Sequence, residues 1–247
     1  MTLEEFFTEH KKVALAFSGG VDSAYLLYKA KACGADVKPY FVKSQFQPDF
    51  EEEDARRLVR QLGMSFTKID LDVLKEAAVR ENPADRCYYC KQCIFDALIA
   101  AAEQDGYPMV MDGTNASDQE EDRPGMRALR ERKVVSPLKE AGLTKEQIRD
   151  LSKEAGLFTW DKPSYACLAT RIPTGTSITE ASLKKIEVGE TWLWKLGFRD
   201  FRLRLFHEGA RLEFQPEQME MAIAKRKEII EGLKPYFDKV LLDMEGR

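Results

Sequence analysis

Residues 14–23 read ALAFSGGVDS, an apolar run that stops at a serine and two glycines and continues into an aspartate and a second serine. The apolar residues 13–17 predict a buried strand, and a helical pattern follows from residue 22. A strand that turns through glycine into a helix gathers backbone N–H groups, hydroxyls and a helix N-terminus in one small volume. The stretch therefore predicts a phosphate site, made by Ser18, Gly19, Gly20, Asp22 and Ser23.

The residue types in this loop exclude two common nucleotide-binding motifs. The loop lacks the Gly-Lys-Ser/Thr end of a Walker A sequence, whose lysine grips the β and γ phosphates, and it is not G-x-G-x-x-G. The alternative without a function is a tight strand-to-helix turn with Asp22 as the helix N-cap, because any α/β protein needs such turns.

The first half of the chain alternates strand-like and helix-like segments. Strands are predicted at 13–17, 36–42, 65–72 and 108–113, and helices at 22–34, 49–63 and 86–105. Strands separated by helices of this length imply right-handed crossovers and a parallel sheet covered on both faces. The fold class is therefore an α/β doubly wound parallel sheet, with ligands at the carboxyl ends of its strands.

The character of the sequence changes around residues 171–179, which read RIPTGTSIT. Beyond this connection we expect a helix at 180–196, a hairpin at 200–214, a helix at 217–233 and a last strand at 239–243. We therefore predict two domains, a nucleotide-binding domain at 1–175 and a small C-terminal α+β domain at 176–247. The small domain is expected to bind substrate or to form a homo-oligomer.

Composition limits the function classes. With 44% hydrophobic and 32% charged residues the chain is typical of a folded globular protein, and a net charge of −4 argues against nonspecific binding to nucleic acid. The N-terminus does not resemble a signal peptide, and no apolar stretch approaches membrane-spanning length, so we expect a cytoplasmic protein with no membrane partner. The five cysteines then favour metal or redox chemistry over disulfides.

The sequence S-G-G-x-D-S after the first strand resembles the PP-loop of the N-type ATP pyrophosphatases, proteins of the adenine nucleotide alpha hydrolase-like class. DGTNASD (112–118), after the fourth strand, resembles the second motif of that superfamily. The resemblance implies that the loop and Gly113 bind ATP, with Asp22 acting in catalysis through Mg²⁺. It also implies that the loop holds the β,γ-pyrophosphate and leaves the α-phosphorus open to attack.

Three further stretches resemble the LarE family of this superfamily: EDRPGMRAL (121–129), KPSYACLATRIPTGT (162–176) and CYYCK (87–91). The similarity runs through nearly the whole chain. It implies an enzyme that adenylates the carboxylates of pyridinium-3,5-biscarboxylic acid mononucleotide and converts them to thiocarboxylates, for the nickel-pincer cofactor of lactate racemase. The alternatives are a tRNA thiolation enzyme with the same chemistry, which the acidic charge disfavours, and a nucleotide-binding regulator without turnover.

The cysteines bear on the source of the sulfur. In one form of the LarE family a single sacrificial cysteine supplies it, but that position is Ala166 here. Cys167 is shifted by one residue and, with Cys87 and Cys90, resembles the iron–sulfur form of the family. There, three thiolates hold a [4Fe–4S] cluster that carries a sulfide, so the resemblance makes these cysteines catalytic and metal-binding. Sulfide or another sulfur donor is expected as a partner.

A helical wheel separates Cys93 from the other cysteines of the predicted helix at 86–105. Its core face is marked by Ile94, Phe95, Leu98, Ile99 and Ala102, with Cys87 near the edge of that face and Cys90 about 60° farther round. Cys93 points to the opposite side, so we expect it not to be a ligand. A structural zinc site of four cysteines, with Cys93 included, remains an alternative. Cys33 is expected to be a buried small hydrophobe.

Two arginines of the predicted hairpin alternate with leucines, so Arg202 and Arg204 share one face of a strand. Paired guanidinium groups suit a phosphate or carboxylates, whereas the alternative is a solvated face of an edge strand. In the LarE family the substrate site uses arginines on the matching strand and a glutamate that matches Glu190. The resemblance thus implies substrate-binding roles for Arg202, Arg204 and Glu190, and Arg171 is a further candidate.

Overall fold

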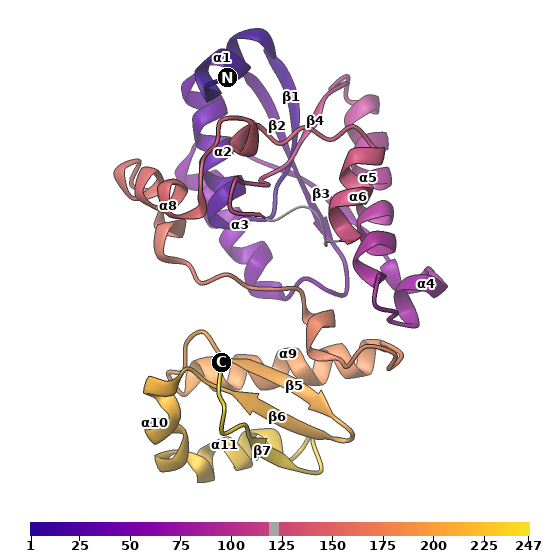
Figure 1. Cartoon of the computed structure of the whole chain (residues 1–247), viewed down its shortest axis with the longest axis vertical. Coiled ribbons are helices and arrows are strands. Elements are labelled where there is room, and N and C mark those ends of the chain that lie inside the picture. Colours follow the sequence, from indigo (N-terminus) through magenta and orange to yellow (C-terminus); the bar gives the residue numbers. More distant parts are fainter. Residues whose placement is uncertain (119–123) are drawn as a thin grey trace. The chain divides into compact units, whose positions relative to one another are not determined.

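The computed structural model describes residues 1–118 and 124–247 and divides into two compact units (Figure 1). Unit 1 comprises residues 1–79 and 85–162, and unit 2 comprises residues 80–84 and 163–247. Apart from residues 80–84, unit 2 begins at residue 163, whereas the sequence led us to expect the second domain to begin at residue 176. Residues 121–123 of the EDRPGMRAL stretch lie outside the described residues.

A four-stranded parallel sheet forms the centre of unit 1. Its strands are β1 (Lys12–Ala16), β2 (Asp36–Lys43), β3 (Thr67–Asp70) and β4 (Val110–Met111). Their order is β3-β2-β1-β4, and every pair of neighbours is parallel. Because β1 lies inside the sheet and the order reverses around it, the carboxyl end of β1 is where ligands are expected in a doubly wound fold. The predicted α/β class is confirmed.

Helices cover both faces of this sheet. They are α1 (Leu3–Glu9), α2 (Val21–Ala32), α3 (Asp49–Gln61), α5 (Arg86–Gln104), α6 (Pro124–Glu131), α7 (Pro137–Glu140) and α8 (Lys145–Glu154), with short 3-10 turns η1 (Val73–Lys75) and η2 (Phe158–Asp161). The short helix α4 (Ala77–Arg80) ends at the first residue of unit 2.

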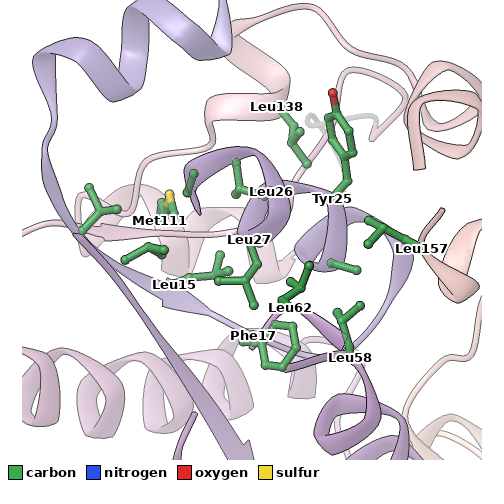
Figure 2. Packing of buried hydrophobic residues seen from close by; sticks show 14 of the residues in the cluster. Leu15, Phe17, Tyr25, Leu26, Leu27, Leu58, Leu62, Met111, Leu138 and Leu157 are labelled. Atoms are coloured by element: carbon green, nitrogen blue, oxygen red, sulfur yellow. The ribbon is translucent and has the colours of Figure 1, made fainter. Parts of the chain in front are cut away.

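The two faces bury two separate hydrophobic clusters. Leu15 of β1 and Phe17 after it pack with residues of α2, α3 and α7 (Figure 2). Ala14 points to the other cluster, where it packs with residues of α5 and α6, because successive side chains of a strand alternate between faces. Phe95, Leu98 and Ala102 are buried in this second cluster, as the helical wheel predicted, and Ile94 and Ile99 pack beside them.

Unit 2 contains a second, three-stranded sheet. Its elements are η3 (Leu168–Arg171), α9 (Glu180–Lys195), β5 (Arg202–Phe206), β6 (Gly209–Glu213), η4 (Pro216–Gln218), α10 (Met219–Ala224), α11 (Arg226–Leu233) and β7 (Val240–Leu242). Strand β6 lies in the middle, antiparallel to β5 and parallel to β7.

Two helices, α10 and α11, occupy the segment where a single helix was expected. The single helix predicted at 217–233 is wrong, because Lys225 leaves helical geometry at φ −90° and ψ 14° and divides α10 from α11. The Lys225 ammonium donates to the carbonyl of Leu196, 2.6 Å away, just beyond α9, which holds the break in place. In the described part of the chain, no helix has both the length and the apolar character needed to cross a membrane.

Candidate functional site

The loop between β1 and α2 folds back on itself through its two serines. The Ser18 and Ser23 hydroxyl oxygens are 3.2 Å apart, and the Ser18 N–H donates to the Ser23 hydroxyl at 3.3 Å. The Gly20 N–H donates to the Ser18 hydroxyl at 3.3 Å. Gly19 has φ 71°, and a Cβ there would lie 3.1 Å from Ala55 of α3, so only glycine fits this turn.

Asp22 is not the N-cap of α2, so this part of the alternative is wrong. Gly20 is the N-cap, in extended conformation, and its carbonyl accepts the Ala24 N–H at 2.9 Å. The helix begins at Val21, one residue earlier than the aspartate, because the two glycines complete the turn alone. The Asp22 carboxylate in the first turn of α2 is therefore not used as a cap.

Other segments of unit 1 contact that carboxylate. Asn115 donates its side-chain amide to Asp22 Oδ1 at 3.3 Å, and the Lys145 ammonium donates to Asp22 Oδ2. Burial raises the pKa of Asp22, while Lys145 opposes this effect and Asp118 adds to it. A carboxylate oxygen beside a phosphate-type loop is a ligand that Mg²⁺ commonly takes.

The second motif lies directly against the loop. Gly113 has no side chain, and a Cβ at this position would lie 3.0 Å from the Ser23 nitrogen and 3.2 Å from the Asp22 Cβ. The preceding carboxylate, Asp112, is buried and accepts hydroxyl hydrogen bonds from Thr114 at 2.6 Å and Ser136 at 2.7 Å. The structure thus brings Gly113 together with the predicted loop residues at the carboxyl ends of β1 and β4.

Two lysines near the loop were not identified from the sequence. Lys145 is the first residue of α8, where a Thr144–Gln147 capping box fixes the helix start. The Lys162 ammonium lies 3.5 Å from the Gly19 carbonyl oxygen and 2.6 Å from Asp54 Oδ2. The capping box can be read in the sequence, but nothing local indicates which residues these ammonium groups meet.

Cys87 and Cys90 lie one turn apart at the start of α5, with Cys87 exposed and Cys90 half-buried. The Arg86 guanidinium donates to the Cys87 sulfur at 3.6 Å. Burial raises the pKa of the Cys93 thiol, and the nearby Glu76 and Asp96 add to this, so the protonated thiol is favoured there. Among the described residues, no group of three or more His, Cys, Asp or Glu side chains could hold a metal ion.

Cys33 and Cys167 have different surroundings. Cys33 is the C-cap of α2 and packs, half-buried, against the hydrophobic cluster of unit 1. Cys167 is half-buried in unit 2 as the N-cap of η3. Its carbonyl accepts the Thr170 hydroxyl at 2.8 Å.

Arg171 and Glu190, both predicted to bind substrate, form a buried ion pair in unit 2. Their exposed fractions are 0% and 1%, and Arg171 Nε is 2.9 Å from Glu190 Oε1. Burial acts to lower the pKa of Arg171, but Glu190 outweighs it and the pKa is raised. Arg171 also donates to the carbonyl of Ala166 at 2.8 Å, and Tyr165 donates its hydroxyl to Glu190. The pair therefore holds the segment that carries Cys167.

The two arginines of β5 differ in their surroundings. Arg202 is 7% exposed and donates to the carbonyls of Phe201 at 2.7 Å and Ser164 at 3.1 Å. Burial, and then the charge of Arg171, lower the pKa of Arg202. A solvated strand face is therefore wrong for Arg202. Arg204 is more exposed and donates from Nε to Glu213 at 2.6 Å.

No family model matches the sequence. Comparison with known proteins does find relatives. The chain is 34% identical to the uncharacterized protein slr1717 of Synechocystis sp., over 99% of this chain and 92% of that protein. It is 32% identical to the pyridinium-3,5-bisthiocarboxylic acid mononucleotide synthase of Lactiplantibacillus plantarum, over 86% of this chain and 78% of that protein. The tRNA-specific 2-thiouridylase MnmA of Pseudothermotoga lettingae is 28% identical, over 61% of this chain and 54% of that protein.

Proposed function

The chain belongs to the LarE family of pyridinium-3,5-bisthiocarboxylic acid mononucleotide synthases, and from this we propose that it is an ATP-dependent sulfur transferase. Its substrate is pyridinium-3,5-biscarboxylic acid mononucleotide, and its product is the thiocarboxylate that becomes the nickel-pincer cofactor. The tRNA thiolation enzymes are more distant relatives and share the sulfur-transferring chemistry.

The observation that carries the proposal is the surroundings of Asp22. Its carboxylate lies beside a loop closed by two serine hydroxyls and carries the Lys145 ammonium as a counterion. Backbone N–H groups, hydroxyls and the ammonium of Lys145 suit a pyrophosphate group, and Asp22 suits the Mg²⁺ that accompanies it. Lys162, near the Gly19 carbonyl, adds a second positive charge to this part of unit 1.

The proposed reaction has two steps. A substrate carboxylate oxygen attacks the α-phosphorus of ATP, the bond to the β-phosphate oxygen breaks, and pyrophosphate leaves with an acyl adenylate formed. Sulfur at the hydrosulfide level then attacks the acyl carbon, and the bond from that carbon to the AMP oxygen breaks. AMP leaves, the sulfur loses its proton to solvent, and the thiocarboxylate remains.

On the resemblance to the iron–sulfur form of the LarE family, we propose Cys87, Cys90 and Cys167 as the ligands of a [4Fe–4S] cluster. Cys87 and Cys90 belong to unit 1 and Cys167 to unit 2, so neither unit of the described chain holds all three ligands by itself. Thiolates are the ligands that such clusters take, and the first two cysteines lie one turn apart at the start of α5. When bound, such a cluster would supply the sulfide for transfer. Cys93 is left out of the proposed ligand set because the helical wheel directs it away from the core face of α5, near whose edge Cys87 lies.

Product analysis tests this function. Purified protein is incubated under anaerobic conditions with ATP, Mg²⁺ and the biscarboxylate mononucleotide, and the nucleotide and phosphate products are identified by chromatography. We expect AMP and pyrophosphate, released only when the substrate is present. ADP with phosphate would contradict the assignment, absence of any turnover would favour a nucleotide-binding regulator, and thiolated tRNA in a parallel incubation would favour the thiouridylase reading.

Two aspartate variants sharpen the test. Asp22→Ala should abolish pyrophosphate release, because it removes the proposed Mg²⁺ ligand. The control is Asp150→Ala, which removes an exposed carboxylate from α8 and should retain full turnover. Equal activity of the two variants would remove Asp22 from the mechanism.

A further inference from the structure

Two arginines face each other across the hairpin of unit 2. The antiparallel register places Arg204 of β5 directly opposite Arg211 of β6. Like charges at directly opposed positions of a sheet destabilise it unless a counterion is present. Glu213 supplies the counterion, because its Oε1 accepts from Arg204 Nε at 2.6 Å and from Arg211 Nη2 at 2.9 Å.

In the cluster of Arg204, Arg211 and Glu213, the two guanidinium groups are more exposed to solvent than the carboxylate that they share. The side chains of Arg204 and Arg211 are 36% and 39% exposed, whereas that of Glu213 is 9% exposed. An anion that approaches from solvent therefore meets the two guanidinium groups first. The remaining contacts are Arg204 Nη1 with the Thr170 carbonyl at 2.8 Å and Arg211 Nε with Asp243 Oδ2 at 3.4 Å.

Each guanidinium keeps donor capacity for a ligand. Arg204 Nη2 and Arg211 Nη1 have no hydrogen-bond partner among the described residues, and the buried Nε of Arg211 makes no hydrogen bond there. Arg202, by contrast, is buried with its donors on two backbone carbonyls. The sequence suggested Arg202 and Arg204 as a pair on one strand, whereas the exposed pair runs across two strands.

We propose that Arg204 and Arg211, held side by side by Glu213, form the subsite that binds the phosphate monoester of the mononucleotide substrate. A phosphate dianion accepts several charge-assisted hydrogen bonds at once, which suits two guanidinium groups better than one. Glu213 orders both side chains before the ligand arrives, so less side-chain entropy is lost on binding. The inference rests on the proposed function for the identity of the ligand, and it assigns Arg211 a role beyond that function.

Equilibrium binding in the absence of turnover tests the subsite. The probes are nicotinic acid mononucleotide and its riboside, two pyridinium carboxylates that differ only in the phosphate, and ATP. Wild-type protein should bind the mononucleotide at least about tenfold more tightly than the riboside, as expected for lost charge-assisted hydrogen bonds. Arg211→Met should reduce that preference to about twofold or less while its affinity for the riboside and for ATP stays unchanged.

Arg204→Met should have the same effect, and the double variant should add little, because the two groups act on one phosphate. The matched control is Arg226→Met, which removes an exposed arginine of α11 and should keep the wild-type preference. Circular dichroism verifies folding of each variant.

Several outcomes would overturn the subsite. They are an Arg211→Met variant with the wild-type preference, a wild-type protein with no preference for the phosphate, and equal losses for mononucleotide and riboside. A matching loss for ATP would assign the arginines to the phosphates of ATP instead. If the protein forms AMP but its preference for the mononucleotide over the riboside does not depend on Arg211, only the subsite is rejected. If that preference depends on Arg211 but no AMP is formed, only the proposed function is rejected.

Discussion

The ion pair between Lys145 and Asp22 places an ammonium group where a magnesium ion and a pyrophosphate group are proposed to bind. Lys145 begins α8, and its backbone N–H donates to the Ser117 hydroxyl at 2.9 Å, which ties the helix start to the second motif. Its ammonium group neutralises Asp22 in the absence of ligand. In the proposed complex, Asp22 would hold Mg²⁺, and the Lys145 ammonium would then be available to the phosphates.

Lys145→Met should therefore weaken pyrophosphate binding by about ten- to a hundredfold, the usual effect of losing a charge-assisted hydrogen bond. Because Lys145 acts to lower the pKa of Asp22, its removal should raise that pKa further, and the acidic limb of the turnover profile should move to higher pH. Isothermal titration with pyrophosphate and a pH profile of AMP formation measure the two effects.

Lys145→Arg should restore most of the binding, since it keeps the charge. Lys153→Met, an exposed position of the same helix, serves as the control and should match wild type. A Lys145→Met variant with unchanged pyrophosphate affinity would show that the ion pair with Asp22 is structural only.

At the level of elements, one buried ion pair joins three parts of unit 2. Glu190 of α9 accepts from Arg171 of η3 and, at 3.1 Å, from the backbone N–H of Leu203 in β5. The Arg171 guanidinium also donates to the Ala166 carbonyl and to the Thr170 hydroxyl, which lie on either side of Cys167 in the sequence. The position of the Cys167 segment is thus determined by a pair that sequence reading assigned to substrate.

Glu190→Ala should lower the free energy of unfolding by about 3–5 kcal/mol, because it leaves the buried Arg171 charge without its partner. Urea denaturation followed by circular dichroism measures the change. Glu220→Ala, at an exposed position of α10, should change stability by less than about 0.5 kcal/mol.

The double variant Arg171→Met with Glu190→Leu removes both charges and should be less destabilised than the sum of the single variants. A loss of under about 1 kcal/mol in Glu190→Ala would contradict a structural role for the pair. In that case its assignment to substrate binding would be favoured.

At the scale of the whole molecule, the proposed cluster draws its ligands from two distant parts of the sequence, the start of α5 and the segment before η3. Protein purified without oxygen should be brown and carry about four irons per chain. Single alanine variants of Cys87, Cys90 and Cys167 should each lose colour and iron, as measured by absorbance and metal analysis.

Cys93→Ala is the control and should keep both colour and iron, because Cys93 lies outside the proposed ligand set. Stoichiometric zinc without iron, lost also in Cys93→Ala, would instead support a structural zinc site of four cysteines.

The sequence by itself determined the features that depend on neighbouring residues. Alternation of short apolar runs with amphipathic helices predicted the parallel sheet, which is confirmed, and the contiguous loop at 18–23 led to the phosphate site that stays a prediction. Phe95, Leu98 and Ala102 were correctly placed on the core face of α5 because a helix repeats every 3.6 residues. The periodicity of strands and helices depends only on residues close together in the sequence, so the sequence is enough to predict it.

Tertiary structure alone decided which charged side chains meet. Lys145 reaches Asp22, Arg171 reaches Glu190, and Arg211 lies opposite Arg204, although nothing in the sequence indicated these pairings. Strand register and helix packing bring together residues far apart in the chain, and burial then selects between a paired charge and a solvated one. The sequence therefore predicted the strand, turn and helix around the loop, whereas the ion pairs near it and in unit 2 follow from how the elements pack.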